Sequence, residues 1–410
     1  MSQDTGLQPG LRATDGRQNG AGVTPRWERR VVGERPWLHL ALFVLTALSV
    51  MATWVAWSAH VGASWTDLDA RFFAESGLFA GALLLFLTVH EFGHYFAGKF
   101  HKVSTSLPYY IPLPLLGIGT LGAVIRIREP IPSTRKLFDI GASGPIAGFV
   151  VAVVVLLIAL ATVPGPEYAL TFTGHDGLKE YVETYGRYPD ALLPDDAAAP
   201  GSTLMVGGTL LYWGLTQLFP NVPPMYEMYH FPLLFAGWLG LFFTALNLLP
   251  VGQLDGGHIL YSLVGPRWHG WIARGFVLLL LLSGSIGLMA IEQSALPAWL
   301  AAIGSGKWIL LAALLYVYLQ RLFAGDHAII APVLVALVVS TAIAGAGGET
   351  ITRFGYSGWL VWSALIVFLI KVDHPPVLYS EPLSTGRRLL GYLSILIFVL
   401  CFSVRPLYTV

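Results

Sequence analysis

Long apolar stretches alternate with polar connections along most of the chain. Nine of them are long and apolar enough to form membrane-spanning helices, which need about 20 residues. They are 37–59, 77–99, 137–162, 231–250, 271–292, 307–323, 327–345, 356–371 and 388–404. Two of these, 307–323 and 356–371, are short, so the number of spans can differ by one or two. The pattern predicts an all-α polytopic membrane protein with about nine transmembrane helices.

Two connections depart from this helical pattern. Residues 107–127 are apolar, but the prolines and glycines that interrupt them oppose a helix. Within this stretch, residues 120–127 have the composition of a β-strand. Non-helical backbone is tolerated at membrane depth only against protein or a wet cavity, so we expect a small re-entrant β-hairpin here. Residues 203–219 are moderately apolar, and we interpret them as a helix at the membrane interface.

Composition supports a lipid environment. Of the 410 residues, 55% are hydrophobic and only 12% are charged, about half the charged fraction of a soluble domain. Such a surplus of apolar surface needs lipid, so we expect the lipid bilayer as surroundings. The net charge is zero, so we expect no nucleic-acid partner. The single cysteine, Cys401, excludes a disulfide framework within the chain and a thiolate zinc cage.

Basic residues set the expected orientation. Lysines and arginines gather before residue 36 and in the connections 100–136 and 372–388, which should therefore lie on the cytoplasmic side. The connection 163–230 is rich in Asp and Glu and should lie outside. With nine spans, the N-terminus is then cytoplasmic and the C-terminus lies outside. Residues 1–36 lack an early apolar core, so we interpret them as a disordered cytoplasmic tail and not as a signal peptide.

An HExxH motif, His90-Glu91-Phe92-Gly93-His94, lies inside one of the apolar stretches. Two histidines at positions i and i+4 share one helix face and can bind one metal ion. Glu91 lies beside them and can accept a proton from water at the metal. Ionisable residues are costly within a membrane, which favours a functional interpretation. The alternative is a buried polar cluster that holds helices together.

Two histidines leave a tetrahedral zinc ion one protein ligand short. The candidate third ligand is Asp255, in the segment NLLPVGQLDGG at 247–257, where an apolar helix ends. Pro250 and Gly252 should break that helix, and the two glycines after Asp255 should let the chain turn sharply. The alternative is an ordinary Asp-Gly turn at the membrane interface.

The expected orientation brings both motifs to the same side. The helices 77–99 and 231–250 both run from outside to inside, because one helix, 137–162, returns between them. His90 and Asp255 should therefore both lie toward the cytoplasm. This arrangement requires that residues 203–219 do not cross the membrane, because one more span would place Asp255 on the opposite side.

Small residues and further histidines complete the sequence features. GPIAG at 144–148 is a GxxxG pattern, in which Gly144 and Gly148 leave a groove against which we expect the catalytic helix to pack. Three other histidines lie near helix ends. We assign them no metal role, since interfacial histidines are usually satisfied locally: His230, His258 and His374.

The paired motifs resemble the site-2 protease family of intramembrane metalloproteases. HEFGH lies inside a membrane helix, and NLLPVGQLDGGH (247–258) follows far downstream. Further stretches resemble the plastid and bacterial branch that lacks a PDZ domain: GTLGAVIRI (119–127), GASGPIAGF (141–149), FAGWLGLFFTALNLLPVGQLDGGH (235–258) and HPPV (374–377). The resemblance spans roughly residues 77–390, and the 163–230 connection is short for a PDZ module.

The resemblance implies an intramembrane zinc metalloendopeptidase with one Zn²⁺ per chain. Its substrates would be membrane proteins, cut within or next to their transmembrane segments. Glu91 would be the general base, and Asn247 would help to hold substrate or the oxyanion near the metal. The zinc ligands would be His90, His94 and Asp255. The hairpin would guide an unwound substrate strand through the backbone of three residues, Ala123, Val124 and Ile125.

The implied organisation is a tail, 1–36, followed by a membrane protease domain, 37–404. That domain would comprise the core catalytic helices 77–99, 137–162 and 231–258, an extracytoplasmic insert at 163–230, and the accessory helices within 271–404. We expect a protein integral to a bacterial plasma (inner) membrane, with its active site toward the cytoplasm. The sequence identifies neither the natural substrate nor the oligomeric state.

Three other interpretations stay open. Another membrane zinc protease, such as a prenyl-protein endopeptidase, would use a downstream glutamate as third ligand, against which the Leu-Asp-Gly context of Asp255 argues. A transporter could use buried His and Asp, but transporters often show duplicated halves and none is visible. An inactive scaffold of the same fold would lack a catalytic residue, whereas every expected one is present.

Overall fold

The computed structural model describes residues 35–58, 68–114, 117–193, 204–291 and 304–409. Its helices are α1 (Pro36–Thr53), α2 (Ala70–Phe100), α3 (Thr134–Thr162), α4 (Asp176–Tyr185), α5 (Leu210–Thr216), α6 (Pro232–Asn247), α7 (Asp255–Met289), α9 (Lys307–Leu322), α10 (His327–Ala346), α11 (Glu349–Thr352), α12 (Gly358–Ala364) and α13 (Thr385–Cys401). Shorter turns are η1 (Trp54–Ala56), η2 (Pro166–Thr171), η3 (Met228–His230), η5 (Gly304–Gly306) and the π-helical η6 (Leu365–Ile370). The strands are β1 (Tyr109–Pro112), β2 (Thr120–Val124), β3 (Leu204–Val206) and β4 (Leu407–Thr409). The predicted disordered tail lies almost entirely outside the described residues.

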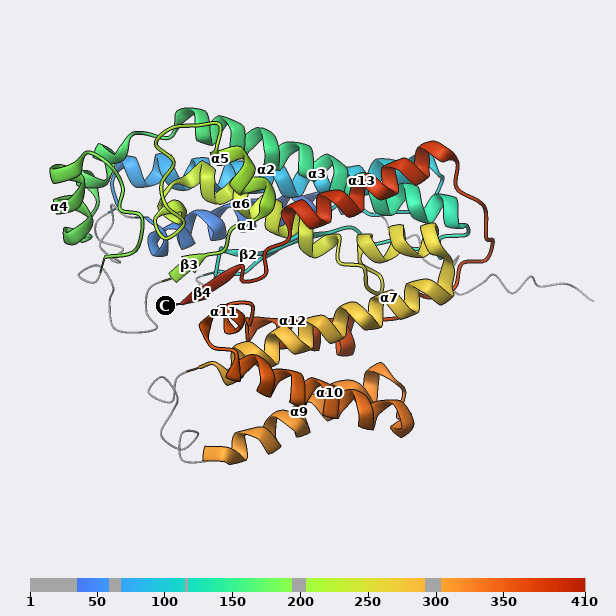
Figure 1. Cartoon of the computed structure of the whole chain (residues 1–410). Coiled ribbons are helices and arrows are strands. Elements are labelled where there is room, and N and C mark those ends of the chain that lie inside the picture. The colour runs from blue at the N-terminus through green and yellow to red at the C-terminus, as the bar shows by residue number, and fades with distance from the viewer. Residues whose placement is uncertain (1–34, 59–67, 115–116, 194–203, 292–303, 410) are drawn as a thin grey trace, which may run out of the picture. The chain divides into compact units, whose positions relative to one another are not determined.

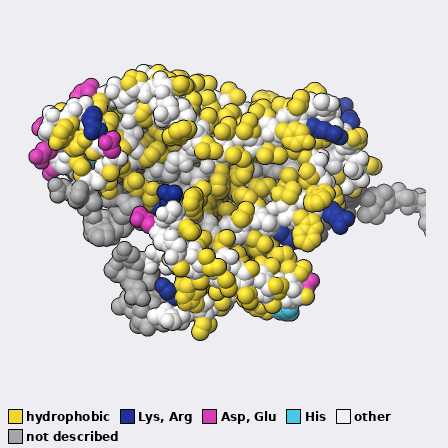
Figure 2. Space-filling model, viewed as in Figure 1, with side chains coloured by type: hydrophobic (Ala, Val, Ile, Leu, Met, Phe, Trp, Pro, Cys, Tyr) yellow, Lys and Arg dark blue, Asp and Glu magenta, His cyan; other side chains and the backbone are white. Residues whose placement is uncertain are grey.

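Each of the nine predicted apolar stretches contains a helix (Figure 1). Among the described residues, five helices are long and apolar enough to cross a membrane: Pro36–Ala56, Ala70–Phe100, Thr134–Thr162, Asp255–Met289 and His327–Ala346. Broad apolar surface covers these and neighbouring helices (Figure 2). The prediction of a mostly helical chain is therefore confirmed, and the structure has candidate membrane-spanning helices as expected, while the number nine stays a prediction.

The long helices begin and end where local chemistry requires it. Asp69 caps α2 by accepting a 2.8 Å hydrogen bond from the Phe72 amide. Ser133 caps α3 in the same way. The helix predicted from residue 271 begins earlier, since α7 starts at Asp255. It has one break, at Gly265, which has a φ of 80° and is followed by Pro266.

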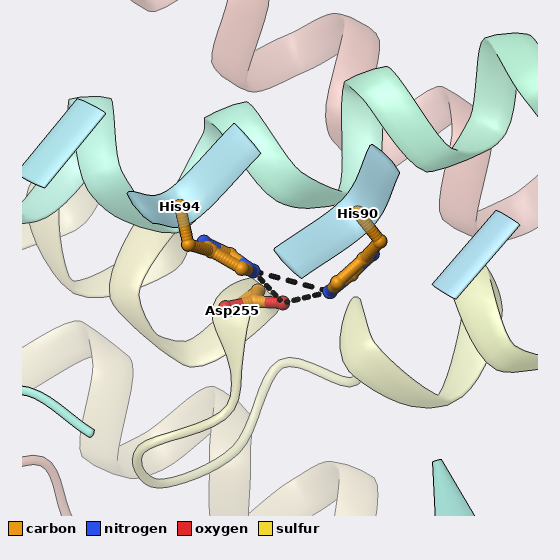
Figure 3. Close-up of side chains that lie close together, drawn as sticks. All are labelled: His90, His94 and Asp255. Atoms are coloured by element: carbon orange, nitrogen blue, oxygen red, sulfur yellow. Dashed lines mark hydrogen bonds and ion pairs between the residues drawn. The ribbon is translucent and has the colours of Figure 1, made fainter. Parts of the chain in front are cut away.

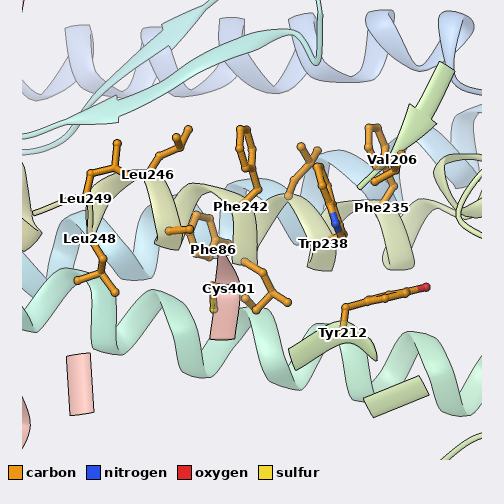
Figure 4. Close-up of a cluster of buried hydrophobic side chains, with 14 of the residues drawn as sticks. Phe86, Val206, Tyr212, Phe235, Trp238, Phe242, Leu246, Leu248, Leu249 and Cys401 are labelled. Carbon is orange, nitrogen blue, oxygen red and sulfur yellow. The ribbon is translucent and has the colours of Figure 1, made fainter. Parts of the chain in front are cut away.

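The helix α6 lies at the centre of the packing. It contacts α2, α3 and α13, and α3 in turn contacts α7, against which α10 and α12 pack (Figure 1). Twelve of the 16 residues of α6 are buried, so protein covers most of its surface. Its large side chains, such as Trp238 and Phe242, fill the core beside Phe86 of α2 and Cys401 of α13 (Figure 4).

The strands β1 and β2 pair antiparallel within the stretch predicted to be a hairpin. Tyr109 lies opposite Val124, and an isolated bridge joins Thr105 to Ile127. The strand β2 is thus shorter than the predicted 120–127. Gly119, with φ of 84°, lies so close to α1 that a Cβ there would be 2.6 Å from the Cα of Val50. Only glycine fits this approach, which holds the two strands against α1.

In the described residues of the connection 163–230, the elements are all small. Of residues 203–219, predicted as one interfacial helix, only the seven residues of α5 are helical, and β3 precedes them. Such a helix is far too short to span, while its interfacial position stays a prediction. The strand β3 pairs antiparallel with β4, with Leu204 opposite Thr409. The insert and the end of the described chain therefore lie side by side.

Candidate active site and metal centre

The three predicted zinc ligands converge at one point (Figure 3). His90 and His94 project from one face of α2 toward Asp255, the first residue of α7. The Nε2 atoms of the two histidines lie 3.1 Å apart. The Oδ2 atom of Asp255 lies 3.5 Å from Nε2 of His90 and 3.2 Å from Nε2 of His94. All three side chains are largely buried, with 4%, 8% and 16% of their surface exposed.

This spacing fits a zinc ion. Bonds of about 2.0–2.1 Å in a tetrahedron place neighbouring ligand atoms about 3.3 Å apart, and the three observed separations lie between 3.1 and 3.5 Å. Nδ1 of His94 donates to the Ile140 carbonyl at 2.7 Å. In the neutral imidazole this bond leaves the lone pair of Nε2 directed at the site, as in many metal-ligating histidines. The donor set and its geometry therefore suit zinc.

Close backbone approaches position Asp255. Gly252, with φ of 53°, is the turn residue of the preceding loop, and a Cβ there would lie 1.9 Å from the Lys371 carbonyl. Gly256 and Gly257 were expected to form this turn, but they lie in the first turn of α7. Their Cβ atoms would meet the carbonyls of Leu248 and Gly252 at 2.0 and 2.4 Å. The carboxylate of Asp255 lies at the helix N-terminus, where a negative charge is favoured.

Glycines on α3 make room for α2, as predicted from GPIAG. A Cβ at Gly144 would lie 2.1 Å from Nε2 of His94, and one at Gly148 would lie 3.2 Å from Nδ1 of His90. In the opposite direction, Gly93 of α2 allows the Ser143 carbonyl to approach. The expectation that the helix with the HExxH motif packs on this groove is confirmed.

The predicted base, Glu91, lies on α2 between the two histidines and is buried. The backbone of Ile125, directly after β2, hydrogen-bonds its carboxylate. Of the other two strand residues predicted to contact substrate, Ala123 is buried and Val124 is 49% exposed. The end of β2 therefore reaches the predicted catalytic carboxylate.

Asn247, the last residue of α6, also reaches the site. Its Nδ2 atom lies 3.5 Å from Nε2 of His90. The structure therefore brings Asn247 together with the three candidate ligands, at a distance where its amide can contact a molecule bound beside His90.

A pair of histidines lies directly behind Asp255, and the sequence patterns did not indicate it. Nδ1 of His258 lies 2.8 Å from Nε2 of His374, and the His374 ring packs on Tyr261. Burial lowers the pKa of His374. A Cβ at Gly141 would lie 2.7 Å from the Cβ of His258. Both histidines lie within stretches that carry the family resemblance. That resemblance was the one feature of the sequence that could have drawn attention to them.

Comparison with known proteins gives several relatives. The chain is 31% identical over 194 residues to "Probable zinc metalloprotease EGY1, chloroplastic" of Oryza sativa subsp. japonica. These residues are 47% of the chain and 29% of the relative. It is 27% identical over 267 residues to "Probable zinc metalloprotease EGY2, chloroplastic" of Arabidopsis thaliana. The aligned residues are 64% of the chain and 42% of the relative. The chain thus spans less than half the length of these relatives. No solved structure matches.

The model of peptidase family M50 matches residues 78–283. This range runs from α2 to α7 and includes the HExxH motif, Asn247 and Asp255. It covers half of the chain, and it agrees with the resemblance to site-2 proteases seen in the motifs. The chain belongs to peptidase family M50.

Proposed function

We propose that the chain is an intramembrane zinc metalloendopeptidase that cuts membrane proteins within or next to their transmembrane segments. The observation that carries this proposal is the convergence of His90, His94 and Asp255 at the spacing of a tetrahedral zinc site. These residues would hold one zinc ion. The names of the plant relatives and the family match support the same activity.

The residues around this centre have separate roles in the proposed hydrolysis. Bound zinc supplies Lewis acidity toward water and the scissile carbonyl. Glu91, buried beside the ligands, takes the proton from the attacking water and returns it to the leaving amine. Asn247 donates its amide N–H groups to the substrate carbonyl as negative charge develops there. Burial of the site limits access of bulk water.

Substrate would reach Glu91 along β2. A transmembrane helix hides its peptide carbonyls in hydrogen bonds, so its substrate segment must unwind before cleavage. The backbone of residues 123–125 could then pair with it by strand addition, since the end of β2 lies at Glu91. We propose that β1 and β2 form a re-entrant hairpin at membrane depth for this purpose.

We also propose the orientation predicted from charge. Contacts at one end of the helices support it, because the connections 100–136 and 372–388 meet there: Thr134 donates to the Glu381 carbonyl at 2.7 Å, and Arg387 pairs with Asp139. Acidic side chains gather around α4 (Figure 2). The pairing of β3 with β4 agrees with an insert and a C-terminus on the same outer side. These contacts agree with a topology of nine spans in which the active site lies toward the cytoplasm.

In this proposal, residues 37–404 form the protease domain and the helices after 270 are accessory. The plant relatives carry the word chloroplastic in their names, which describes those proteins. The bacterial plasma membrane expected from the sequence stays a proposal for this chain.

Glu91→Gln tests the function most directly. The zinc ligands remain, so zinc content should stay at the wild-type level while cleavage of a model transmembrane substrate is lost, by about 100-fold or more for a general base. The exposed Glu349 of α11 provides a matched control, because Glu349→Gln should change neither quantity. Cleavage by Glu91→Gln at the wild-type rate would remove Glu91 from the mechanism. If the wild type still cleaved substrate after its zinc was removed, the proposal that the chain is a zinc metalloprotease would be contradicted.

A further inference from the structure

A second group of metal-ligating side chains lies between the insert and the start of α6. His175 precedes α4. Glu227 directly precedes η3, and His230 is the last residue of η3. One Oε2 atom of Glu227 faces both histidines, at 3.6 Å from Nε2 of His175 and 3.7 Å from Nε2 of His230. The three ligand atoms all lie within 4.8 Å of one another. Glu227 and His230 are buried.

The outer hydrogen bonds of these histidines match those of metal ligands. Nδ1 of His230 donates to the Trp57 carbonyl at 2.6 Å, and Nδ1 of His175 approaches the Thr173 carbonyl at 3.3 Å. With Nδ1 carrying the proton, each neutral ring directs the lone pair of Nε2 toward Glu227. His94 is held in the same manner at the first site, by the Ile140 carbonyl. The separations from Glu227, 3.6 and 3.7 Å, exceed hydrogen-bond length and lie a few tenths of an ångström above the spacing of about 3.3 Å between ligands of a tetrahedral zinc ion.

The backbone directs His175 toward this point. Its φ of 57° and ψ of 41° are left-handed, a conformation that is uncommon outside glycine. The adjacent Gly174 also has a positive φ, of 73°. These two residues turn the chain so that the His175 ring packs edge-on against that of His230, with centroids 5.1 Å apart.

The group is separate from the catalytic centre. The ring of Phe172 packs against both histidines and against Tyr168, whose hydroxyl lies 3.4 Å from the Glu75 carboxylate on α2. His90 follows Glu75 by four turns of α2, which at 1.5 Å per residue is about 22 Å further along the helix. One ion cannot serve both groups.

We propose that His175, Glu227 and His230 form a second zinc site, with a structural role. Two imidazoles and one carboxylate are a donor set that zinc accepts, and binding would draw the three atoms toward the spacing of about 3.3 Å that a tetrahedral ion imposes. The ion links the insert to the segment entering α6, and through the Trp57 carbonyl to the end of α1. His230 thereby gains the metal role that the sequence did not suggest. This site is independent of the proteolytic function proposed above.

Zinc stoichiometry of the purified full-length chain in detergent tests this site. The chain is stripped with a chelator, reloaded with Zn²⁺, freed of excess ion by gel filtration and analysed by mass spectrometry. We expect about two ions per chain for the wild type and about one for His90→Ala/His94→Ala, which lacks the first site. His175→Asn should also bind about one, because asparagine tolerates the left-handed backbone and is a poor zinc ligand. Combining all three substitutions should leave about none.

Controls keep this test decisive. His327 is an exposed histidine of α10, so His327→Ala should bind two ions. If His175→Asn does not fold, Glu227→Gln replaces it, since the amide keeps the size of the buried side chain. Added Zn²⁺ should also raise the unfolding temperature of His90→Ala/His94→Ala but not that of the triple variant. Two ions in folded His175→Asn, or none in His90→Ala/His94→Ala, would overturn the proposal and leave a charged His–Glu cluster.

Discussion

Replacing Gly144 by alanine probes the metal centre through one added methyl group. The new Cβ would lie 2.1 Å from Nε2 and 2.4 Å from Cδ2 of His94. Ordinary contact begins at 3.4 Å, so the imidazole or the helix α3 has to move by about 1.3 Å. Metal–ligand distances tolerate deviations of only about 0.2 Å. The ring therefore cannot stay at its place in the zinc site.

The expected result is a loss of zinc affinity by about 100-fold or more. Removing a residue that merely supports a ligand typically costs 10–100-fold in metal affinity, and here the ligand itself is displaced. Overpacking should also lower the free energy of unfolding by about 1–3 kcal/mol. Competition with a chelator measures the affinity, and cleavage of a model transmembrane substrate should fall in parallel. Gel filtration and circular dichroism would establish that the variant is folded.

Two other glycines provide a graded comparison. Gly81 of α2 has no neighbour within 4 Å of its ideal Cβ, so Gly81→Ala should leave zinc affinity and cleavage unchanged. Gly148→Ala meets Phe86 at 3.0 Å and His90 at 3.2 Å, which side chains can relieve by a few tenths of an ångström, so its loss should be intermediate. Wild-type zinc affinity and cleavage in folded Gly144→Ala would refute the placement of His94 against α3.

Three further predictions concern the ligand, the strand and the orientation. Asp255→Ala removes one of three protein ligands, so zinc affinity and cleavage should both fall by at least about 100-fold; unchanged zinc content would make Asp255 a turn residue only. Val124→Pro removes a backbone donor and fixes φ, so cleavage should drop while zinc stays bound and Val124→Ala stays active; full activity in the folded proline variant would exclude strand addition there. Single cysteines at the exposed Glu183 and Arg135, labelled on intact cells with an impermeant thiol reagent, should react at 183 and not at 135, and the reverse would invert the protein. Cys401 is fully buried and needs no replacement in these experiments.

The convergence of His90, His94 and Asp255 was predictable because each motif is local and chemically specific. Two histidines one helical turn apart share a face in any α-helix, so His90 and His94 were fixed by spacing alone. Asp255 was a candidate because it lies in a Leu-Asp-Gly segment where an apolar helix was expected to break. What spacing could not show was how the segments meet. The hydrogen bond between His258 and His374 joins residues 116 positions apart, and nothing in either local pattern indicates the other.

Helix boundaries were less predictable, for two physical reasons. The start of α7 was placed at 271 because residues 258–270 contain His, Arg and Gly-Pro, which lower the apolar signal. Protein packing tolerates these residues where lipid would not, and the helix extends to Asp255 with a break at Gly265. The helix predicted at 203–219 is shorter than expected for a different reason. The strand β3 pairs with β4, so residues 204–206 contact residues 407–409. Such a non-local contact overrides the weak helical preference of residues 204–206.

The helix α3 connects the sequence pattern to the chemistry most directly. Gly141, Gly144 and Gly148 follow the i, i+3, i+7 spacing of one helix face. Each faces a different histidine of the site, since their missing Cβ atoms would meet His258, His94 and His90 in turn. Those histidines come from two helices, α2 and α7, that are separated by more than 150 residues of chain. A larger side chain anywhere on this face would push one of them away from Asp255 or from its partner. The GASGPIAG stretch is therefore best understood as the surface that sets the relative position of the two ligand-bearing helices, and its small residues serve the metal geometry as well as helix packing.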